Sequence, residues 1–476
     1  MTEQSKTKPE SLAGQMSDFS PKLSPMLVKE LRQGTRTNMF SIAFILLHSF
    51  MILCLLVAMS NPTSDDSSAF FWFIITVILL FVQPLRGFSA LSSEYQMNTM
   101  DLIQMTQLNG WRITLGKWTA LNAQGMLFIT GVLPYIVMRY FLGNIDIVMD
   151  LVGLLLVGIG SAFATAITVG CSVFQNIILR GTIVIALGIA FTSLFTIVTS
   201  QVFGRGAIGA DQWFNIGILV VACIYGCFFF LSFGASRISP LAENHATRKR
   251  LVAIAAGLIC ALFLYSSVDE STIIIVCGII LGMSCIDAIT EPLPIFSRVL
   301  LPFSKNPITQ LQALYLSPGW ISGLGFFLVC SSLFFGIFVA ANFITGSNLI
   351  EDREDAVALI SGFNLFVLPL IFIHLFLPKE TAARFAFPIY VGVQAVIIGV
   401  TIMVAAIANA VGRWEDLIYT LLPFPSVLLF AYGDHSISKP HYLFIALGTT
   451  LLCLIVPLLR NRKSVGEFFT HLKPRS

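Results

Sequence analysis

Long apolar runs separated by short polar segments dominate the chain. A helix needs about 20 mostly apolar residues to cross the hydrocarbon core of a bilayer, and such runs recur from residue 40 to residue 459. The predicted spans are 40–59, 70–88, 118–141, 147–173, 177–202, 214–234, 251–268, 272–290, 319–342, 357–377, 385–408 and 441–459. The pattern therefore predicts an all-α polytopic integral membrane protein with about 12 transmembrane helices.

One further apolar stretch, 417–433, is interrupted by Pro423 and Pro425 and is too short to span. We interpret it as a re-entrant hairpin rather than a thirteenth crossing. This interpretation keeps the number of spans even and both termini on one side of the membrane.

Composition supports the membrane assignment. Hydrophobic residues make up 56% of the chain and charged residues only 11%, whereas soluble domains carry about 25% charged residues. The nine cysteines lie in apolar runs without a CxxC pair, so neither disulfides nor a zinc site are expected. Cys223 and Cys227 share a helix face, which we interpret as packing. The first 38 residues are too polar for a signal peptide, and we expect the first span to be retained.

The basic residues predict the orientation. With the N-terminus in the cytoplasm, 23 of the 28 lysines and arginines fall in predicted cytoplasmic segments. Cytoplasmic loops of membrane proteins are enriched in these residues, and one miscounted span would reverse every later loop and remove the contrast. Both termini are therefore predicted to be cytoplasmic.

A basic amphipathic helix is predicted just before the first span. Lys29, Arg32 and Arg36 are spaced i, i+3 and i+7, while Leu27 and Leu31 share another face. Such a helix is suited to the headgroup region. The alternative is a simple positive anchor for the first span.

The cytoplasmic loop 89–117, between the second and third spans, is predicted to contain a second short amphipathic helix. Thr99 is a suitable N-cap, Asp101 lies in the first turn and Gly110 ends the helix. The apolar stripe is Met100, Ile103 and Leu108. This pattern predicts a docking surface for a partner, and the alternative is a generic amphipathic loop.

The order of residues in this loop resembles a known family signature. The matching positions are Glu94, Thr99, Asp101, Leu102, Thr106, Leu108, Gly116 and Lys117. They resemble the pattern E-x-x-x-G-T-L-E-L-L-x-x-T-P-L-S…I-x-x-G-K of permease subunits of ATP-binding-cassette (ABC) transporters of the type-2 exporter class. Residues 28–32 similarly look like the connecting helix of those permeases. The resemblance covers residues 1–240, with Asn98 and Gln107 departing from the common Gly and Pro.

The resemblance implies that the loop forms a coupling helix in a groove of a separate cytoplasmic ABC ATPase subunit. The ATPase-coupling residues would be Glu94, Thr99, Asp101, Leu102 and Thr106, with Gly116 and Lys117 at the start of the third span. ATP hydrolysis would belong to the partner, so the chain is not expected to be an enzyme by itself or to hold a cofactor. The implied location is the bacterial cytoplasmic (inner) membrane. The expected partners are the ATPase and membrane lipid, with no nucleic acid, and a homodimer is left open.

The chain shows no nucleotide-binding or catalytic motif of its own. Gly110-x5-Gly116-Lys117-Trp118 has one residue too many for a phosphate-binding loop, and Trp118 replaces the magnesium-binding hydroxyl residue. The six histidines form no metal-binding motif. His48 and His374 fall within spans, where they either line a pathway or pack between helices, and we favour packing.

The chain divides into a cytoplasmic tail (1–39) and two predicted six-span halves, 40–240 and 241–476. The second half has a long cytoplasmic loop, 291–318, in the position of the first-half coupling loop. Gly110-Trp111-x3-Leu115-Gly116 also corresponds to Gly319-Trp320-x3-Leu324-Gly325. We interpret this as a repeat with a degenerate second coupling loop, although so short a match also arises by chance.

Two other functions are considered. An ion-coupled secondary transporter normally needs ionisable residues near the bilayer midplane, whereas Arg86, Arg180 and Asp287 are predicted near span ends. A membrane scaffold without transport activity is the other alternative. The transported substrate is not predicted by any motif.

Overall fold

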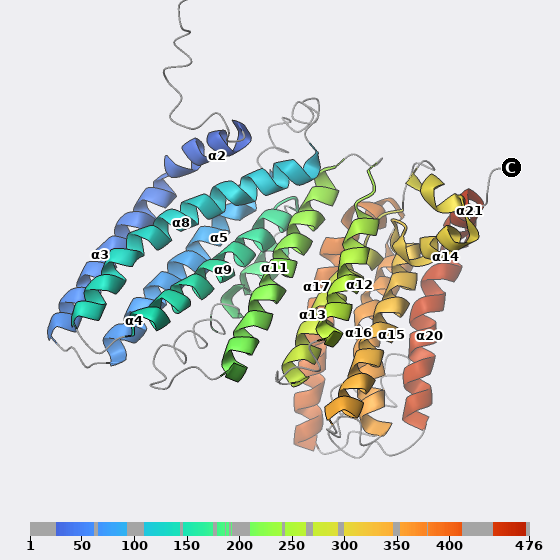
Figure 1. Cartoon of the computed structure of the whole chain (residues 1–476). Helices are drawn as coiled ribbons and strands as arrows, with labels where there is room; N and C mark the ends of the chain where they lie inside the picture. The colour runs from blue at the N-terminus through green and yellow to red at the C-terminus, as the bar shows by residue number, and fades with distance from the viewer. Residues whose placement is uncertain are drawn as a thin grey trace, which may run out of the picture. The chain divides into compact units, whose positions relative to one another are not determined.

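The computed structural model describes residues 25–60, 65–92, 109–142, 146–174, 179–185, 187–189, 192, 210–239, 243–262, 270–293, 299–345, 353–377, 379–411 and 441–472. These residues form helices joined by turns, and no strand occurs among them. Figure 1 shows the long helices and several shorter ones at their ends. The predicted hairpin 417–433 lies outside the described residues, as does most of the predicted span 177–202.

Six of the described helices are long and apolar enough to cross a bilayer. They are Asn38–Ser60, Ser68–Ser89, Gly110–Leu142, Ile147–Cys171, Ile216–Ile238 and Trp320–Ala341. A seventh span results if Phe444–Arg460 and Arg462–Leu472, which meet at 81°, count as one. The predicted polytopic helical membrane protein is confirmed, and the count of 12 spans stays a prediction.

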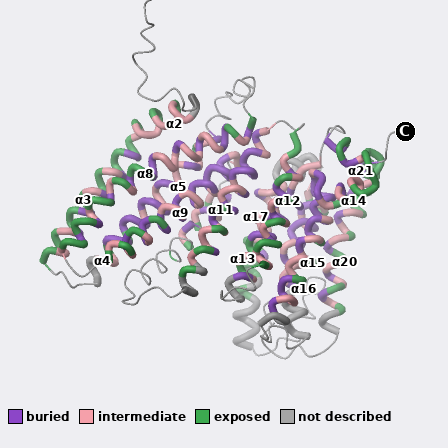
Figure 2. Tube along the Cα trace, viewed as in Figure 1, coloured by how far each residue is buried: buried purple, intermediate pink, exposed green. Residues whose placement is uncertain are grey.

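The exposed side chains of these helices are those that suit lipid. In the first span Ile45, Leu56 and Met59 are each more than half exposed, and Figure 2 shows exposed positions along this helix, α3. In water a continuous apolar face of this kind would favour aggregation. In a bilayer the same apolar face contacts the hydrocarbon chains of the lipid.

Contacts divide the chain into two compact units. The first contains Met1–Ser172 and Leu187–Arg205, and the second contains Val173–Ala186 and Gly206–Ser476. The helix Ala210–Ile238 (α11) therefore packs within the second unit, whereas the predicted first six-span half, 40–240, includes it. The arrangement of two equivalent halves stays a prediction.

The first unit is built around the helix α8. Its elements are α2 (Pro25–Thr35), α3 (Asn38–Ser60), α4 (Asp65–Thr76), η1 (Val77–Val82), α5 (Gln83–Leu85), η2 (Arg86–Ser89), α8 (Gly110–Leu142) and α9 (Ile147–Cys171). Helix α8 contacts α2, α3 and α9, and α9 also packs against η1, α5 and η2. The core includes Leu47, Met51, Phe71, Trp72 and Phe128, all nearly inaccessible to solvent.

The second predicted span is not a uniform α-helix. Elements α4, η1, α5 and η2 follow one another without a break from Asp65 to Ser89. η1 is a π-helical turn, and the backbone N–H of Gln83 donates to the carbonyl of Ile78, five residues earlier. η2 is a 3-10 turn that ends the span. Single π turns inside α-helices are rare and are frequent at functional sites.

The second unit is a bundle around α13. Its elements are α11, α12 (Ala246–Leu262), α13 (Glu270–Ile289), η5 (Leu301–Ser304), α14 (Pro307–Leu316), α15 (Trp320–Thr345), α16 (Arg353–Phe376), α17 (Lys379–Val411), α20 (His441–Arg460) and α21 (Arg462–Leu472). Helix α13 contacts α11, α12, α15 and α16, and α16 also packs against α17 and α20. Among the short elements, η5 contacts both α14 and α21.

Glycines permit the close packing of α14, α15 and α13. Gly319 has a φ of 111°, which a side chain would strain, and it precedes the start of α15. A Cβ atom at Gly323 would overlap the backbone carbonyl of Ala288 in α13. A Cβ atom at Gly325 would overlap the carbonyl of Leu314 in α14. The second half of the Gly-Trp repeat therefore lies at a helix start where backbones touch.

Candidate coupling site

The predicted coupling residues fall into two groups. Glu94, Thr99, Asp101, Leu102 and Thr106 lie in 93–108, outside the described residues. Gly116 and Lys117 are described and lie in the second turn of α8. The described residues of the site therefore lie on either side of 93–108.

Lys117 joins α8 to α2. Its Nζ donates to Oε1 of Glu30 at 3.0 Å. The Lys117 side chain is 3% exposed and that of Glu30 is 21% exposed, so the pair is largely shielded from water. A shielded ion pair is sensitive to the loss of either partner, because the remaining charge is left without compensation.

Arg86, at the end of the second span, also binds the end of α2. Its Nη2 donates to the Gly34 carbonyl at 2.9 Å and to Oγ1 of Thr37 at 3.2 Å. Its Nη1 donates to Oε1 of Gln83 at 3.1 Å, and the guanidinium lies 5.5 Å from the centre of the Phe40 ring. A guanidinium can satisfy several acceptors at once because its donors lie in a rigid plane.

Gln83 completes the link back to α8. Its Nε2 donates to the backbone carbonyl of Leu121 at 2.6 Å, and the residue is 2% exposed. We name this set of residues the polar junction: Glu30, Gly34, Thr37, Gln83, Arg86, Lys117 and Leu121. It joins α2, the end of the second span and the start of α8 through side chains.

Both ends of the loop are held to the helices. Before the loop, the backbone N–H of Leu91 donates to Oγ of Ser172, which follows α9, at 3.1 Å. After residues 93–108, Oδ1 of Asn109 accepts from the backbone N–H of Trp111 at 3.2 Å and caps the start of α8. Further along α8, Nε1 of Trp118 donates to the carbonyl of Ala162 in α9 at 2.9 Å. The loop therefore begins and ends at fixed points.

The polar junction binds its parts together and presents no reactive group. Its donors are ammonium, guanidinium and amide groups that contact carbonyl, carboxylate or hydroxyl oxygens of the same unit. Such an arrangement can transmit a displacement from one helix to another, because moving one element stretches several charged or buried hydrogen bonds at once.

Further buried charges occur near the helix ends of both units. In the first, Nη1 of Arg139 donates to Oδ2 of Asp150 at 3.1 Å, and both residues are buried. In the second, Lys249 donates to Asp287 at 2.6 Å, and Arg250 donates to Glu291 at 2.8 Å. Asp150 is not among the predicted site residues, although an acid inside an apolar run is a recognisable signal.

Arg250 also holds the turn between α14 and α15. Nη1 donates to the carbonyls of Tyr315 and Ser317 at 3.0 and 2.6 Å, and Nη2 donates to the carbonyl of Gly319 at 3.2 Å. Nη1 also donates to Oγ of Ser322 at 2.9 Å. One buried guanidinium from α12 thus supports the C-terminal end of α14 and the turn that follows it.

The two histidines within predicted spans have hydrogen-bonding partners. Nδ1 of His48 lies 3.1 Å from the hydroxyl of Tyr135. Nδ1 of His374 lies 3.0 Å from Nδ2 of Asn461, and its ring lies near that of Trp320, at 4.4 Å between centroids. These contacts agree with the interpretation of both residues as packed polar groups.

Fold and site together define a polytopic helical membrane protein in which α2, the second span and the start of α8 meet in the partly buried polar junction. No protein-family model, curated protein or solved structure matches the chain.

Proposed function

We propose that the chain is the membrane-spanning permease subunit of an ATP-driven exporter, working with a separate cytoplasmic ABC ATPase subunit. In this proposal the chain crosses the bacterial cytoplasmic membrane about 12 times, with both termini in the cytoplasm. Residues 89–117 contain the coupling helix that docks on the ATPase. The chain itself holds no nucleotide.

The observation that supports the proposal most is the polar junction. Residues 93–108, which contain most of the family signature, follow Arg86 and precede Lys117, and both Arg86 and Lys117 bind α2. A push on the loop would therefore reach α2, the second span and α8 together. This is the mechanical property that a coupling helix requires.

The second unit adds a further observation. Helix α14 lies between α13 and α15 in the chain, where the repeat predicts a second coupling loop. Ile308 and Leu311 of α14 are 70% and 64% exposed, and Leu314 continues this apolar stripe at the same spacing. A short amphipathic helix with an exposed apolar stripe is suited to binding in a groove of a partner.

The buried charges do not favour the ion-coupled alternative. Asp150 is the fourth residue of α9 and Arg139 is the fourth from the end of α8. The pair therefore lies about one turn from the helix ends rather than near the middle of a span. An ion-binding site would need such groups near the bilayer centre.

The proposal is tested by purifying the tagged chain from membranes in a mild detergent and identifying the proteins that co-elute. We expect a protein with a Walker A motif, whose co-elution is lost when Asp101 and Leu102 are both replaced by alanine. Phe141→Ala, at the opposite end of α8 from Lys117, is the matched control and should retain the partner. Absence of such an ATPase, or retention of it by the Asp101/Leu102 variant, would contradict the proposal.

A further inference from the structure

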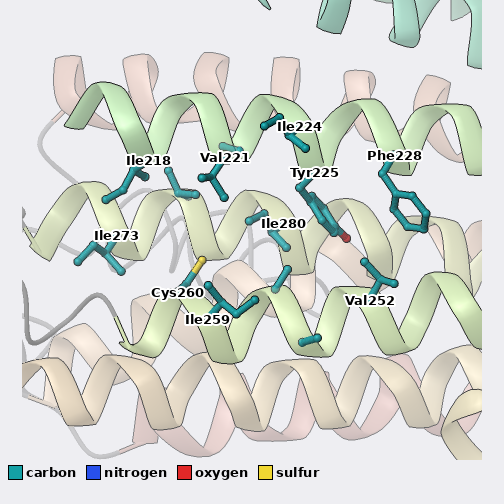
Figure 3. Close-up of a pocket in the computed structure, with 14 residues that line it drawn as sticks. Ile218, Val221, Ile224, Tyr225, Phe228, Val252, Ile259, Cys260, Ile273 and Ile280 are labelled. Atoms are coloured by element: carbon teal, nitrogen blue, oxygen red, sulfur yellow. The ribbon is translucent and has the colours of Figure 1, made fainter. Parts of the chain in front are cut away.

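An apolar groove runs along α11, α12 and α13 in the second unit. It has a volume of about 330 Å³ and is lined by side chains of these three helices, among them Ile218, Phe228, Val252 and Ile259. Figure 3 shows these side chains around the groove. The hydroxyl of Tyr225, which also lines it, is 2.7 Å from Oγ of Ser284 and so has its hydrogen-bonding partner in the protein. The groove therefore favours a hydrocarbon ligand.

The length of the groove matches one leaflet of a bilayer. Ile218 and Phe228 lie at its two ends on α11, ten residues apart, which corresponds to about 15 Å of helix. The hydrocarbon core of a bilayer is about 30 Å thick. One extended acyl chain of a phospholipid occupies half of this thickness.

A positive charge lies at one end of the groove. The guanidinium of Arg248 is 5.6 Å from the centre of the Phe228 ring, and Arg248 is exposed. Arg248, Val252, Ala255 and Ile259 follow the spacing i, i+4, i+7 and i+11, so they form one stripe on α12. Arg248 is the third residue of α12 and thus lies at the end of the helix, where a lipid headgroup is found.

We propose that this groove holds one acyl chain of an anionic phospholipid, with the headgroup phosphate at Arg248. The small side chains of Ala255 and Ala256 leave the space that the chain fills. A guanidinium is well suited to a phosphate because it can donate two parallel hydrogen bonds. The inference depends on the membrane location of the helices and is independent of the proposed transport function.

Native mass spectrometry of the detergent-purified chain, with dioleoyl phosphatidylglycerol or dioleoyl phosphatidylcholine added, tests this site. The wild-type chain should retain one lipid and prefer phosphatidylglycerol. Ala255→Phe fills the groove and should weaken the binding of both lipids about tenfold. Arg248→Gln should still bind lipid, but the ratio of its affinity for phosphatidylglycerol to that for phosphatidylcholine should fall about fivefold, as expected for a partly exposed ion pair.

Two variants serve as controls. Leu258→Phe adds an aromatic ring to an exposed position of α12 that does not line the groove, and Arg462→Gln removes an exposed charge from α21. Both should bind lipid as the wild type does, and all variants are compared for size-exclusion profile and helical content. Wild-type lipid binding by Ala255→Phe, an unchanged preference in Arg248→Gln, or an equal loss in either control would overturn the proposal.

Discussion

At the scale of single residues, close backbone contacts and buried charges are the most demanding features of the molecule. Gly323 and Gly325 belong to the first two turns of α15, and each faces a carbonyl of a neighbouring helix. Backbone atoms cannot move aside as the end of a flexible side chain can. These positions are therefore closed to any larger residue unless the helices separate.

We expect Gly323→Ala and Gly325→Ala to destabilise the protein by about 1–3 kcal/mol each, the cost of overpacking a close contact. Gly336→Ala is the matched control on the same helix, since no atom beyond its own helical turn lies within 4 Å of the added Cβ, and it should be neutral or slightly stabilising. Thermal unfolding in detergent, followed with a dye that reacts with the nine free cysteines, measures the difference. Equal thermal unfolding midpoints for Gly323→Ala and Gly336→Ala would contradict the close contact between Gly323 and the carbonyl of Ala288.

The buried pair of Arg139 and Asp150 gives a second prediction at this scale. Asp150→Leu leaves the Arg139 guanidinium buried without its acid, which should cost about 3–5 kcal/mol. Arg139 also donates to Oγ of Ser68 at 2.7 Å and lies 4.1 Å from the centre of the Phe71 ring. The double variant Arg139→Met with Asp150→Leu should recover much of the loss, because replacing both partners by apolar groups removes the uncompensated charge.

A double-mutant cycle of unfolding free energies checks this pair. Asp146→Asn is the control, because Asp146 is an exposed N-cap that accepts from the N–H of Val148 and asparagine caps equally well. If the changes in unfolding free energy of the two single variants add up to that of the double variant, the pair does not couple α8 to α9.

The sequence could indicate which residues are charged within apolar runs, but not their partners. Lys249 and Arg250 lie at the end of a predicted span, where positive residues are usually exposed. Both are buried here, because α13 and the α14–α15 turn supply hydrogen-bond acceptors. The sequence did not indicate the role of Gln83 in the polar junction, because a single amide in an apolar run is common. Partners depend on how helices pack, which periodicity does not specify.

At the scale of elements, the contact between α2 and α8 is the most consequential. Helix α2 begins at Pro25 and has basic and apolar faces, as the spacing of its residues predicts. Its ion pair to α8 and its backbone contact with Arg86 make this amphipathic helix part of the first unit.

Reversing one charge of the Glu30–Lys117 pair should therefore weaken the unit. Lys117→Glu places two carboxylates together in a shielded site and should lower the unfolding free energy by about 2 kcal/mol. Glu30→Lys combined with Lys117→Glu restores opposite charges and should recover at least half of that loss. Arg32→Glu, an exposed reversal on α2, is the control, and thermal unfolding of the wild type and these three variants decides the outcome. A double variant no more stable than Lys117→Glu would show that the pair contributes no specific attraction.

The elements themselves were predictable to different degrees. The six candidate spans overlap predicted spans because about 20 consecutive apolar residues have few other stable structures. The third begins at Gly110 rather than residue 118, so Gly110 starts α8 and residues 110–117 of the predicted loop are helical. The π turn at Val77–Val82 was not predictable, since its sequence is uniformly apolar and contains neither Gly nor Pro. Helix α12 also begins earlier than predicted, at Ala246 rather than residue 251, and Ala246, Lys249 and Arg250 at its start are buried.

At the scale of the whole molecule, the distribution of charge predicts the topology. Cysteine variants in a background without the native cysteines test it with a membrane-impermeant maleimide. Ser11→Cys, Lys305→Cys and Ser476→Cys should react only from the cytoplasmic side, and Asp66→Cys and Asp146→Cys only from the opposite side. Labelling of Ser11→Cys and Ser476→Cys from different sides would mean an odd number of spans and would contradict the count of 12.

The π turn in the second span has a consequence for motion. An α-helix advances about 100° per residue. The π turn holds one residue more than an α-helical turn, so the residues after Val82 are rotated by about that angle relative to Trp72. If the turn closed to ordinary α-helix, Arg86 would swing away from Gly34 and Thr37 and release the end of α2. The hydrogen bonds of Arg86 to Gly34 and Thr37 therefore depend on the helical register that the π turn sets.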